Sequence, residues 1–247
     1  MSKPLGTAMP VLEPVVLPSM KLRSLFPPNV VIVETVAEGD PASLSAGEAG
    51  HLGRAQPKRA REFAAGRQCA RQALERFGLT GWDLAVQPDR SPAWPEEFVG
   101  SISHTTGFCA AAVGRRPEFR SIGLDVEVGR RVTPDLYPQF LTQVELAQIT
   151  PMPPATADGR ATLIFSAKEA FYKCQYPLTS EWLDFADIEV DLPRDLFDKG
   201  RFGIRPIRGL QLESMVPPPW HGQFVFFDEF VATGFVIPAS GEHQKSR

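Results

Sequence analysis

The chain is predicted to be an α+β protein made of two similar halves. Two segments with helical periodicity, residues 58–77 and 160–176, each stand beside several short apolar segments of strand length. A turn near residues 114–121 separates the two sets, so we expect the halves to join there. The 247 residues are 43% hydrophobic and 22% charged, which is enough to bury a core without disulfides or structural metal.

The first half is predicted to contain one strand, a long helix and a second strand. The long helix has apolar residues such as Phe63, Ala70 and Leu74 at helical spacing, and Gly78 is a typical stop after it. Arg115-Arg116-Pro117 then turns the chain. In chain order, the expected elements are a strand at 30–36, a helical stretch from Pro41, the long helix, a Pro-rich loop at 87–95 and a strand at 108–113.

The second half is predicted to pack two helices on short strands. An amphipathic helix at 139–149 should turn Phe140, Leu141, Val144 and Ile149 inward. The long helix at 160–176 should end at Pro177, because proline interrupts the helical hydrogen-bond pattern. The expected strands are 122–127, 185–191, 201–207, 223–227 and 230–236.

The charge distribution points to an anion rather than to nucleic acid. The net charge of −3 does not suit a polyanion partner for the whole chain. Residues 51–76, however, carry seven basic side chains against Glu62 and Glu75. This segment is either a candidate anion site, with Lys58, Arg59 and Arg67, or a solvated helix face.

The cysteines and the N-terminus suit a reducing, cytoplasmic environment. Cys69, Cys109 and Cys174 are widely spaced, odd in number and surrounded by apolar residues, so we expect free buried thiols. Residues 1–20 do not resemble a signal peptide, because prolines and Glu13 interrupt any apolar run. No segment reaches the length of a membrane span, so no stable membrane association is expected.

Four side chains on two segments indicate phosphate chemistry. Asp125 and Glu127 end an apolar strand and share one face, roughly 6.6 Å apart along it. Glu169 and Lys173 lie one helical turn apart, on a polar side with Lys168 and Tyr172 that we predict to line a cleft. The carboxylates suit a hard cation on a phosphate. A strand that emerges into solvent and a surface ion pair are the alternatives.

The segment Gly100–Gly107 is small and polar and contains His104. Its hydroxyl, imidazole and backbone N–H groups suit phosphate oxygens, although a hydrogen-bonded turn explains the composition equally well. No GxSxG, P-loop or GxGxxG motif occurs, which argues against the hydrolases and nucleotide-binding folds that carry them.

Taken together, five segments are much more specific than any one of them. The segments are Lys58–Leu74, Asp89–Pro95, Ser101–Thr105, Gly123–Glu127 and Phe165–Lys173. In this order they closely resemble the 4′-phosphopantetheinyl transferases of the monomeric surfactin and enterobactin-synthetase type, over residues of about 50 to 190. Many relatives have Trp where Phe165 stands, and the residue at Val126 varies in the family.

The resemblance implies a fold and a reaction. The fold is α+β, with two pseudo-symmetric subdomains that each pack a small antiparallel sheet on a long helix and hold coenzyme A in the cleft between them. The enzyme transfers the 4′-phosphopantetheine arm of coenzyme A to a serine of an apo carrier protein. It needs Mg²⁺ and releases adenosine 3′,5′-bisphosphate.

The resemblance also implies a role for individual residues. Glu169 and Lys173 would be catalytic, with Asp125, Glu127 and Glu169 on Mg²⁺ and Lys173 on the transferring phosphate. Direct ligation by Glu127 is left open, because the Val126 backbone offers an alternative through water. The coenzyme A contacts would be Lys58 and Arg59 at the 3′-phosphate, Arg67 at the nucleotide phosphates, Arg90, Ser91 and Pro92 around the adenine, Ser103 and His104 at phosphate oxygens, and Leu183 near the pantetheine arm.

The expected organisation and partners follow. The predicted divisions are an N-terminal extension at 1–25, a nucleotide-side subdomain at 26–115, a metal and transfer subdomain at 121–240 and a flexible tail at 241–247. The expected partners are carrier proteins of peptide, polyketide or fatty-acid synthases, in siderophore or secondary-metabolite pathways, and the enzyme is expected to be a monomer. A metal-dependent nuclease and a non-catalytic coenzyme A or carrier-protein binding module are the alternatives.

Overall fold

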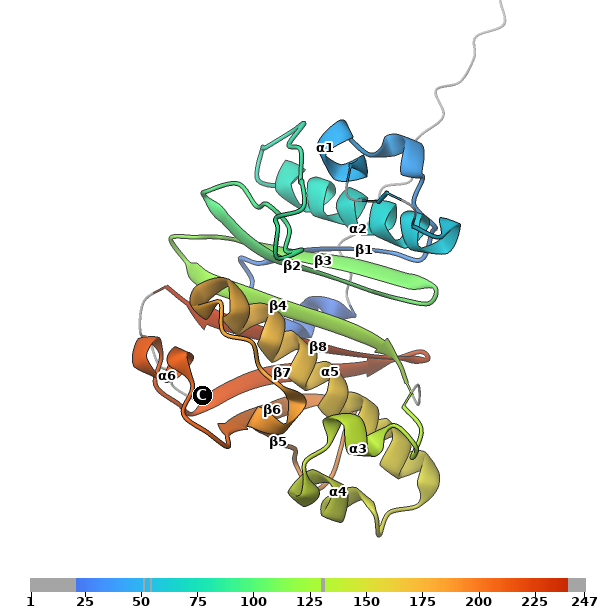
Figure 1. The fold of residues 1–247 in the computed structure, drawn as a ribbon, viewed down its shortest axis with the longest axis vertical. Coiled ribbons are helices and arrows are strands. Elements are labelled where there is room, and N and C mark those ends of the chain that lie inside the picture. The colour runs from blue at the N-terminus through green and yellow to red at the C-terminus, as the bar shows by residue number, and fades with distance from the viewer. Residues whose placement is uncertain (1–20, 51, 54, 130–131, 240–247) are drawn as a thin grey trace, which may run out of the picture.

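Two antiparallel sheets lie one above the other along the long axis of the molecule (Figure 1). The computed structural model describes residues 21–50, 52–53, 55–129 and 132–239. Most of the predicted N-terminal extension, Arg54 of the basic segment and the predicted tail lie outside these residues. The arrangement confirms the predicted α+β class with two subdomains.

The first sheet has three strands in the order β1-β3-β2. The hairpin of β2 and β3 turns at Gly107, whose φ of 79° lies in the left-handed region that glycine adopts without strain. Helix α2 covers one face of the sheet (Figure 1). The elements are β1 (Val31–Thr35), η2 (Pro41–Ser43), α1 (Ala46–Ala49), α2 (Pro57–Glu75), β2 (Phe98–Thr105) and β3 (Phe108–Arg115).

The second sheet has five strands in the order β4-β8-β7-β6-β5, all antiparallel. Its long helix, α5, crosses β4 so closely that a Cβ on Gly123 would lie 1.9 Å from the Ala170 carbonyl oxygen. Only glycine allows this approach. The elements are β4 (Phe119–Val128), α3 (Tyr137–Phe140), α4 (Gln143–Ile149), α5 (Pro154–Thr179), η3 (Phe185–Asp187), β5 (Ile188–Asp191), β6 (Lys199–Pro206), α6 (Gln211–Met215), β7 (Trp220–Phe227) and β8 (Phe230–Pro238).

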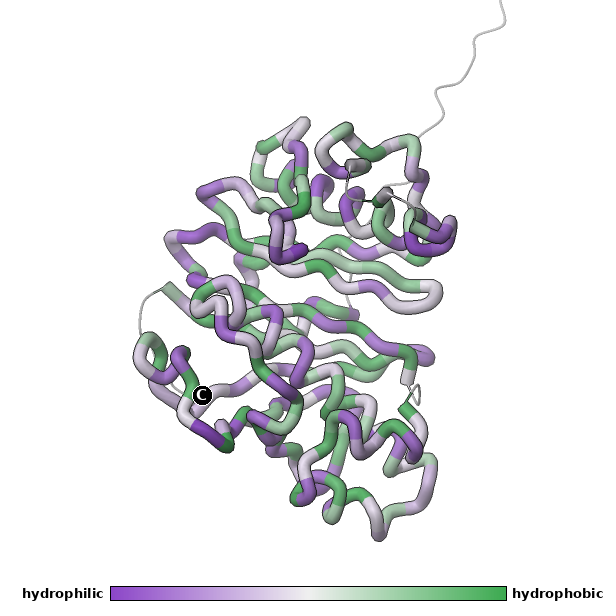
Figure 2. The backbone as a smooth tube through the Cα atoms, viewed as in Figure 1, coloured by the Kyte–Doolittle hydropathy of each residue, from purple (hydrophilic) through white to green (hydrophobic). Residues whose placement is uncertain are grey.

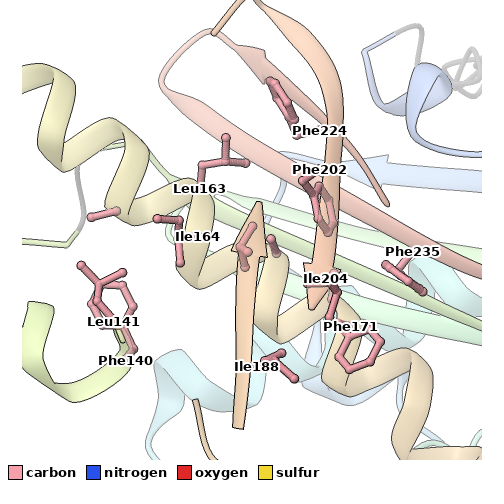
Figure 3. Close-up of a cluster of buried hydrophobic side chains, with 14 of the residues drawn as sticks. Phe140, Leu141, Leu163, Ile164, Phe171, Ile188, Phe202, Ile204, Phe224 and Phe235 are labelled. Atoms are coloured by element: carbon pink, nitrogen blue, oxygen red, sulfur yellow. The ribbon is translucent and has the colours of Figure 1, made fainter. Parts of the chain in front are cut away.

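The core of the second subdomain lies between α5 and its sheet. Leu163 and Phe171 of α5 pack in one cluster with Phe202, Phe224 and Phe235 from the strands (Figure 3). Figure 2 shows hydrophobic stretches along the strands of both sheets and hydrophilic residues at several of the turns between them. This packing fixes the rotation of α5 about its axis, and therefore which of its side chains face the first subdomain.

A 3-10 turn, η1 (Leu22–Leu25), lies inside the predicted N-terminal extension. Leu22 and Leu25 are 0% and 2% exposed and share a cluster with Ala110 and Ala112 of the first sheet and Ala232 of the second. This part of the extension therefore belongs to the core between the two sheets.

Two expectations for the helices of the second half are wrong. The predicted helix at 139–149 is divided into α3 and α4, because Thr142 caps α4 and forms a capping box with Glu145. The division turns Val144 outward, where it is 49% exposed. The other error concerns Pro177, which lies inside α5. It removes a single N–H in the last turn, and α5 continues to Thr179 before Ser180 adopts a left-handed φ of 54°.

The segment around Ser101 and Ser103 is a strand rather than a turn. Residues Phe98–Thr105 form β2, which pairs with β3 from end to end. The residues of β2 do not show the apolar pattern typical of a buried strand. The reason is that β2 lies where the two subdomains meet, and its small polar side chains face that junction. In the part of the chain that the structure describes, no helix is both long and apolar enough to cross a membrane.

Candidate functional site

A cleft of about 770 Å³ lies where the two subdomains meet. One wall is α2 with the loop after it, the floor is β2, and the opposite wall is the C-terminal half of α5. Most of the predicted coenzyme A contacts line it: Arg59, Arg67, Arg90, Ser91, Pro92, His104 and Lys173. Residues from four separate stretches of the sequence thus border one space.

Arg67 brings a buried positive charge to the cleft. The residue is 5% exposed, and its guanidinium lies 4.4 Å from the ring centre of Phe63. Its Nε is buried and has no hydrogen-bond partner among the described residues. Burial lowers the pKa of Arg67 to about 10, with the charge of Glu48 opposing this and the charge of Arg71 adding to it. A bound anion would supply the missing hydrogen bond and place further negative charge beside the guanidinium.

His104 and Arg59 form the next part of the wall. An N–H of the Arg59 guanidinium is in close contact with Nε2 of His104, and Glu62 Oε2 lies 3.9 Å from its Nδ1. Burial lowers the pKa of His104, and the Arg59 charge lowers it further. Lys58 lies outside this cleft, beside a smaller neighbouring hollow of about 410 Å³, and pairs with Glu62 at 3.8 Å.

A phosphate ligand is expected to add a proton to His104 when it binds. The lowered pKa leaves the imidazole neutral at pH 7, whereas a phosphate beside it favours the charged form. Binding therefore gains strength as the pH falls through the pKa of the complex, and loses that gain above it. Calorimetry in two buffers of different ionisation enthalpy counts the protons taken up. Equal uptake by the wild type and by His104→Gln would contradict this role, because the ligand's own phosphates titrate in both.

The loop that carries Arg90 is held in shape before any ligand binds. Asp89 accepts hydrogen bonds from the backbone N–H of Ser91 at 2.9 Å and from its hydroxyl at 2.7 Å. Arg90 has a φ of 71°, an uncommon conformation for a residue with a side chain. The hydrogen bonds to Asp89 stabilise the tip of this loop, which consists of Arg90, Ser91 and Pro92. All three of these residues border the cleft.

Asp125 and Lys173 form an ion pair at the base of the cleft. Lys173 Nζ lies 2.6 Å from Asp125 Oδ1 and 3.3 Å from the Leu124 carbonyl oxygen. Burial alone would lower the pKa of Lys173, but Asp125, Glu169 and Glu127 raise it above its usual value. The lysine is therefore held in its charged form. Burial also raises the pKa of Glu169, with Lys173 opposing this and Asp125 adding to it.

These residues suit a hard divalent cation, although no ready-made cage is present. Among the described residues, no three His, Cys, Asp or Glu side chains come close enough to hold a metal ion. Asp125 Oδ2, however, is buried without a hydrogen-bond partner in the described part of the chain. An oxygen in that state fits a cation such as Mg²⁺, which takes few protein carboxylates and completes its shell with water and phosphate. The set Asp125, Glu127 and Glu169 stays a prediction.

Lys168 and Leu183 pack inside the second subdomain, away from the cleft. Lys168 is 1% exposed and donates to Glu145 and to two carbonyl oxygens inside the second subdomain, so its predicted place on the cleft is wrong. Leu183 is 8% exposed and packs in the hydrophobic core of the same subdomain. Its role beside the pantetheine arm stays a prediction.

Tyr172 lines the cleft as predicted, and the structure brings further residues to it that the motifs did not assign. Tyr172 and Tyr176 line it with ring centres 5.3 Å apart, and Trp182 lies edge-on to Tyr172 at 5.5 Å. Tyr172 and Tyr176 are four residues apart in the helix, and this spacing is a usable signal that the two rings share a face. Arg116 and Arg120, beside the turn between the halves, border the cleft as well.

The fold and the cleft together define a class: a protein of two α+β subdomains with a cleft between them that is lined by several arginines and a lysine. The chain belongs to the 4′-phosphopantetheinyl transferase superfamily. Residues 47–114 match the N-terminal domain of 4′-phosphopantetheinyl transferases, and residues 121–213 match the superfamily's own model. The predicted family is thereby confirmed.

Curated proteins of this family are similar to the chain. It is 39% identical over 165 residues to 4′-phosphopantetheinyl transferase Svp of Streptomyces mobaraensis, a match that covers 65% of this chain and 66% of Svp. It is 30% identical over 169 residues to 4′-phosphopantetheinyl transferase Npt of Nocardia iowensis, covering 68% and 75%. Enterobactin synthase component D of Escherichia coli is 35% identical over 125 residues, covering 50% and 56%. The chain thus matches just under two thirds of the length of Svp.

Proposed function

We propose that this protein transfers the 4′-phosphopantetheine arm of coenzyme A to a serine of an apo carrier protein, with Mg²⁺, and releases adenosine 3′,5′-bisphosphate. One observation carries the proposal. A charged Lys173, paired with a buried Asp125, lies in the same cleft as Arg67, a buried cation whose Nε has no hydrogen-bond partner among the described residues. Family membership and the names of the similar proteins support the same activity.

The cationic wall would bind the nucleotide end of coenzyme A. In this proposal Arg59 and His104 hold the 3′-phosphate side, with Lys58 from the adjoining hollow, and Arg67 holds the nucleotide phosphates. Arg side chains suit this task because the guanidinium fork matches phosphate oxygens. The pre-shaped tip at Arg90, Ser91 and Pro92 would enclose the adenine without a further ordering cost.

In the proposed reaction the serine oxygen of the carrier protein attacks the β-phosphorus of coenzyme A. The new bond joins that phosphorus to the serine oxygen, and the bond to the bridging oxygen breaks. The electron pair leaves with adenosine 3′,5′-bisphosphate, and the serine proton passes to a base. Lys173 stabilises the charge that develops on the phosphoryl oxygens, since positioning and electrostatics supply most of the rate in such transfers.

Glu169 is the proposed base, and Asp125, Glu127 and Glu169 are the residues that would hold Mg²⁺. The cation, when bound, supplies neutralisation of the pyrophosphate charge. Burial raises the pKa of Glu169, which makes the carboxylate a better proton acceptor than an exposed one. Its place beside Lys173 on α5 allows it to act close to the transferring phosphate.

The acceptor in this proposal is a carrier domain of a peptide, polyketide or fatty-acid synthase. The likeness to a component of enterobactin synthase supports a biosynthetic synthase as partner and keeps siderophore or secondary-metabolite pathways in view. We further propose a cytoplasmic enzyme that acts as a monomer, without nucleic-acid partners.

One experiment tests the function. The full chain is incubated with coenzyme A, Mg²⁺ and a panel of apo carrier domains, and each carrier is weighed by mass spectrometry. At least one carrier should gain the mass of one phosphopantetheine arm, and the same carrier with its acceptor serine changed to alanine should not. Binding of coenzyme A without any mass gain would favour the non-catalytic module. Cleavage of DNA with Mg²⁺ in place of transfer would favour the nuclease.

Glu169→Gln is expected to lower kcat by roughly 10²–10⁴-fold, the usual loss when a general base is removed. The amide keeps the shape of the side chain but cannot take a proton. Turnover is followed with the best carrier from the panel, and Glu75→Gln, an exposed change on α2, serves as the matched control. Near-normal turnover by Glu169→Gln would refute the assignment and move the base to water or to Glu127.

A further inference from the structure

The two sheets meet at β2 and β4, but backbone pairing does not join them. β2 uses its backbone groups on β3, and β4 pairs with β8 on its other side. Within the described residues the sheets remain separate, although β2 and β4 run close together (Figure 1). The backbone N–H groups of β4 that face β2 must therefore find other acceptors.

Two serine hydroxyls of β2 supply those acceptors. The backbone N–H of Leu124 donates to Ser101 Oγ at 3.0 Å, and that of Val126 donates to Ser103 Oγ at 3.1 Å. Both bonds span 23 residues, so the two strands run parallel here. Each hydroxyl accepts the hydrogen bond that a backbone carbonyl of a neighbouring strand would otherwise accept. The serine side chains therefore lie between the two backbones. We call these bonds the hydroxyl junction.

Ser103 has a second contact that Ser101 lacks. Its hydroxyl donates to Asp125 Oδ1 at 3.0 Å, whereas the Ser101 hydroxyl has only the Leu124 carbonyl oxygen, at 3.4 Å, as an acceptor. Lys173 contacts the same carboxylate oxygen at 2.6 Å. Both partners thus hold Oδ1, and Oδ2 is the oxygen left buried without a partner among the described residues.

The hydrogen-bond capacity of Ser103 is already used. A hydroxyl has one proton to donate and two lone pairs. The proton goes to Asp125, one lone pair accepts from Val126, and Lys173 Nζ lies 3.4 Å from the oxygen. Ser103 is 3% exposed and is not part of the cleft lining. A phosphate could receive its proton only if the Asp125 bond broke.

We propose that Ser101 and Ser103 join the two subdomains through the hydroxyl junction in place of backbone pairing, and that Ser103 is a positioning residue for Asp125 rather than a phosphate ligand. The bond from Ser103 orients the carboxylate so that Oδ2 is presented to the reacting groups. This second part rests on the proposed function, because it takes Asp125 as a cation ligand in phosphoryl transfer. It replaces the phosphate contact expected for Ser103 from the family resemblance.

Ser103→Ala and Ser101→Ala are the matched pair that tests the proposal. Each removes one junction acceptor and leaves one buried β4 N–H unpaired, so both should lower Tm by similar amounts, roughly 2–10 °C. Only Ser103→Ala also releases Asp125. Its affinity for Mn²⁺, measured by electron paramagnetic resonance with coenzyme A present, should fall about 10–100-fold, as for other residues that orient a metal ligand. The affinity of Ser101→Ala for Mn²⁺ should fall much less. The kcat of Ser103→Ala should likewise be lower than the kcat of Ser101→Ala.

A separate measurement distinguishes positioning from phosphate binding. Coenzyme A is titrated in EDTA, without divalent cations. A positioning residue leaves this Kd within about twofold of wild type, whereas loss of a phosphate hydrogen bond raises it by about tenfold. Ser103→Thr, which keeps the hydroxyl, should restore most of the Mn²⁺ affinity.

Three results would overturn the proposal: a raised coenzyme A Kd in EDTA, equal Mn²⁺ affinities for the two alanine variants, or an unchanged Tm in both. None of these measurements requires turnover. A wild-type protein that binds Mn²⁺ and coenzyme A but transfers nothing would instead contradict the proposed function and leave the hydroxyl junction in place.

Discussion

Lys173→Ala is expected to lower kcat by roughly 10²–10³-fold, the usual loss when a preorganised group that stabilises transition-state charge is removed. The carboxylates of Asp125, Glu169 and Glu127 raise the pKa of Lys173, so its ammonium is charged throughout the neutral range. It faces the cleft from the C-terminal half of α5, where a phosphate bound by Arg67 and His104 would lie within the same space. No other lysine among the described residues borders this cleft.

The measurement must separate lost catalysis from lost structure. Lys173→Ala also leaves the buried Asp125 without its ion-pair partner, so the Tm and the Kd for coenzyme A are recorded alongside turnover. Lys173→Arg, which keeps the charge but changes its geometry, should recover part of kcat. Lys199→Ala on β6, an exposed lysine, is the matched control. A folded Lys173→Ala variant with normal kcat would remove Lys173 from the reaction.

Lys168→Met is expected to destabilise the protein by about 3–5 kcal/mol, the usual cost of removing one partner from a buried ion pair. Lys168 Nζ donates to the carboxylate of Glu145 at 2.8 Å and to the carbonyl oxygens of Phe140 and Phe185 at 2.9 and 2.7 Å. All three protons of the ammonium are thus used. Methionine fills a similar volume but leaves the carboxyl group of Glu145, which is 1% exposed, without its ion-pair partner.

Urea unfolding at neutral pH measures this loss. The midpoint should move to much lower urea for Lys168→Met, while Lys199→Ala should change the unfolding free energy by no more than about 0.5 kcal/mol. Because Lys168 also holds the ends of α3 and η3 against α5, far-ultraviolet circular dichroism before the transition shows whether the variant begins folded. A free energy within 1 kcal/mol of wild type would mean that the pair contributes little.

Residue spacing in the sequence predicts most of the side chains that the candidate site contains. Strand alternation places Asp125 and Glu127 on one face, and helical periodicity places Glu169 and Lys173 on one face, whatever surrounds them. The structure has both segments as expected, a strand and a helix, with α5 packed across β4. These periods are properties of the local backbone, which is why the sequence carries them.

The contact partners of these side chains cannot be predicted in the same way, because contacts between residues far apart in the sequence leave no local pattern. Ser103 and Asp125 are 22 residues apart, and Asp125 and Lys173 are 48 apart. For the same reason, the sequence does not predict the strand β2. Serines occupy these positions because β4 lies beside β2. The residues of Phe98–Thr105 carry no pattern that would indicate β4 as a neighbour.

By itself, then, the sequence determined the α+β class, the two long helices and the residue types of a phosphate site. The tertiary structure decided which of two lysines, five residues apart on α5, faces the cleft. Positions five apart differ by about 140° around a helix axis, so Lys168 and Lys173 cannot face the same side. Packing of Leu163 and Phe171 against the sheet turns Lys168 to Glu145 and Lys173 to the cleft, because burying those apolar side chains fixes the rotation of α5.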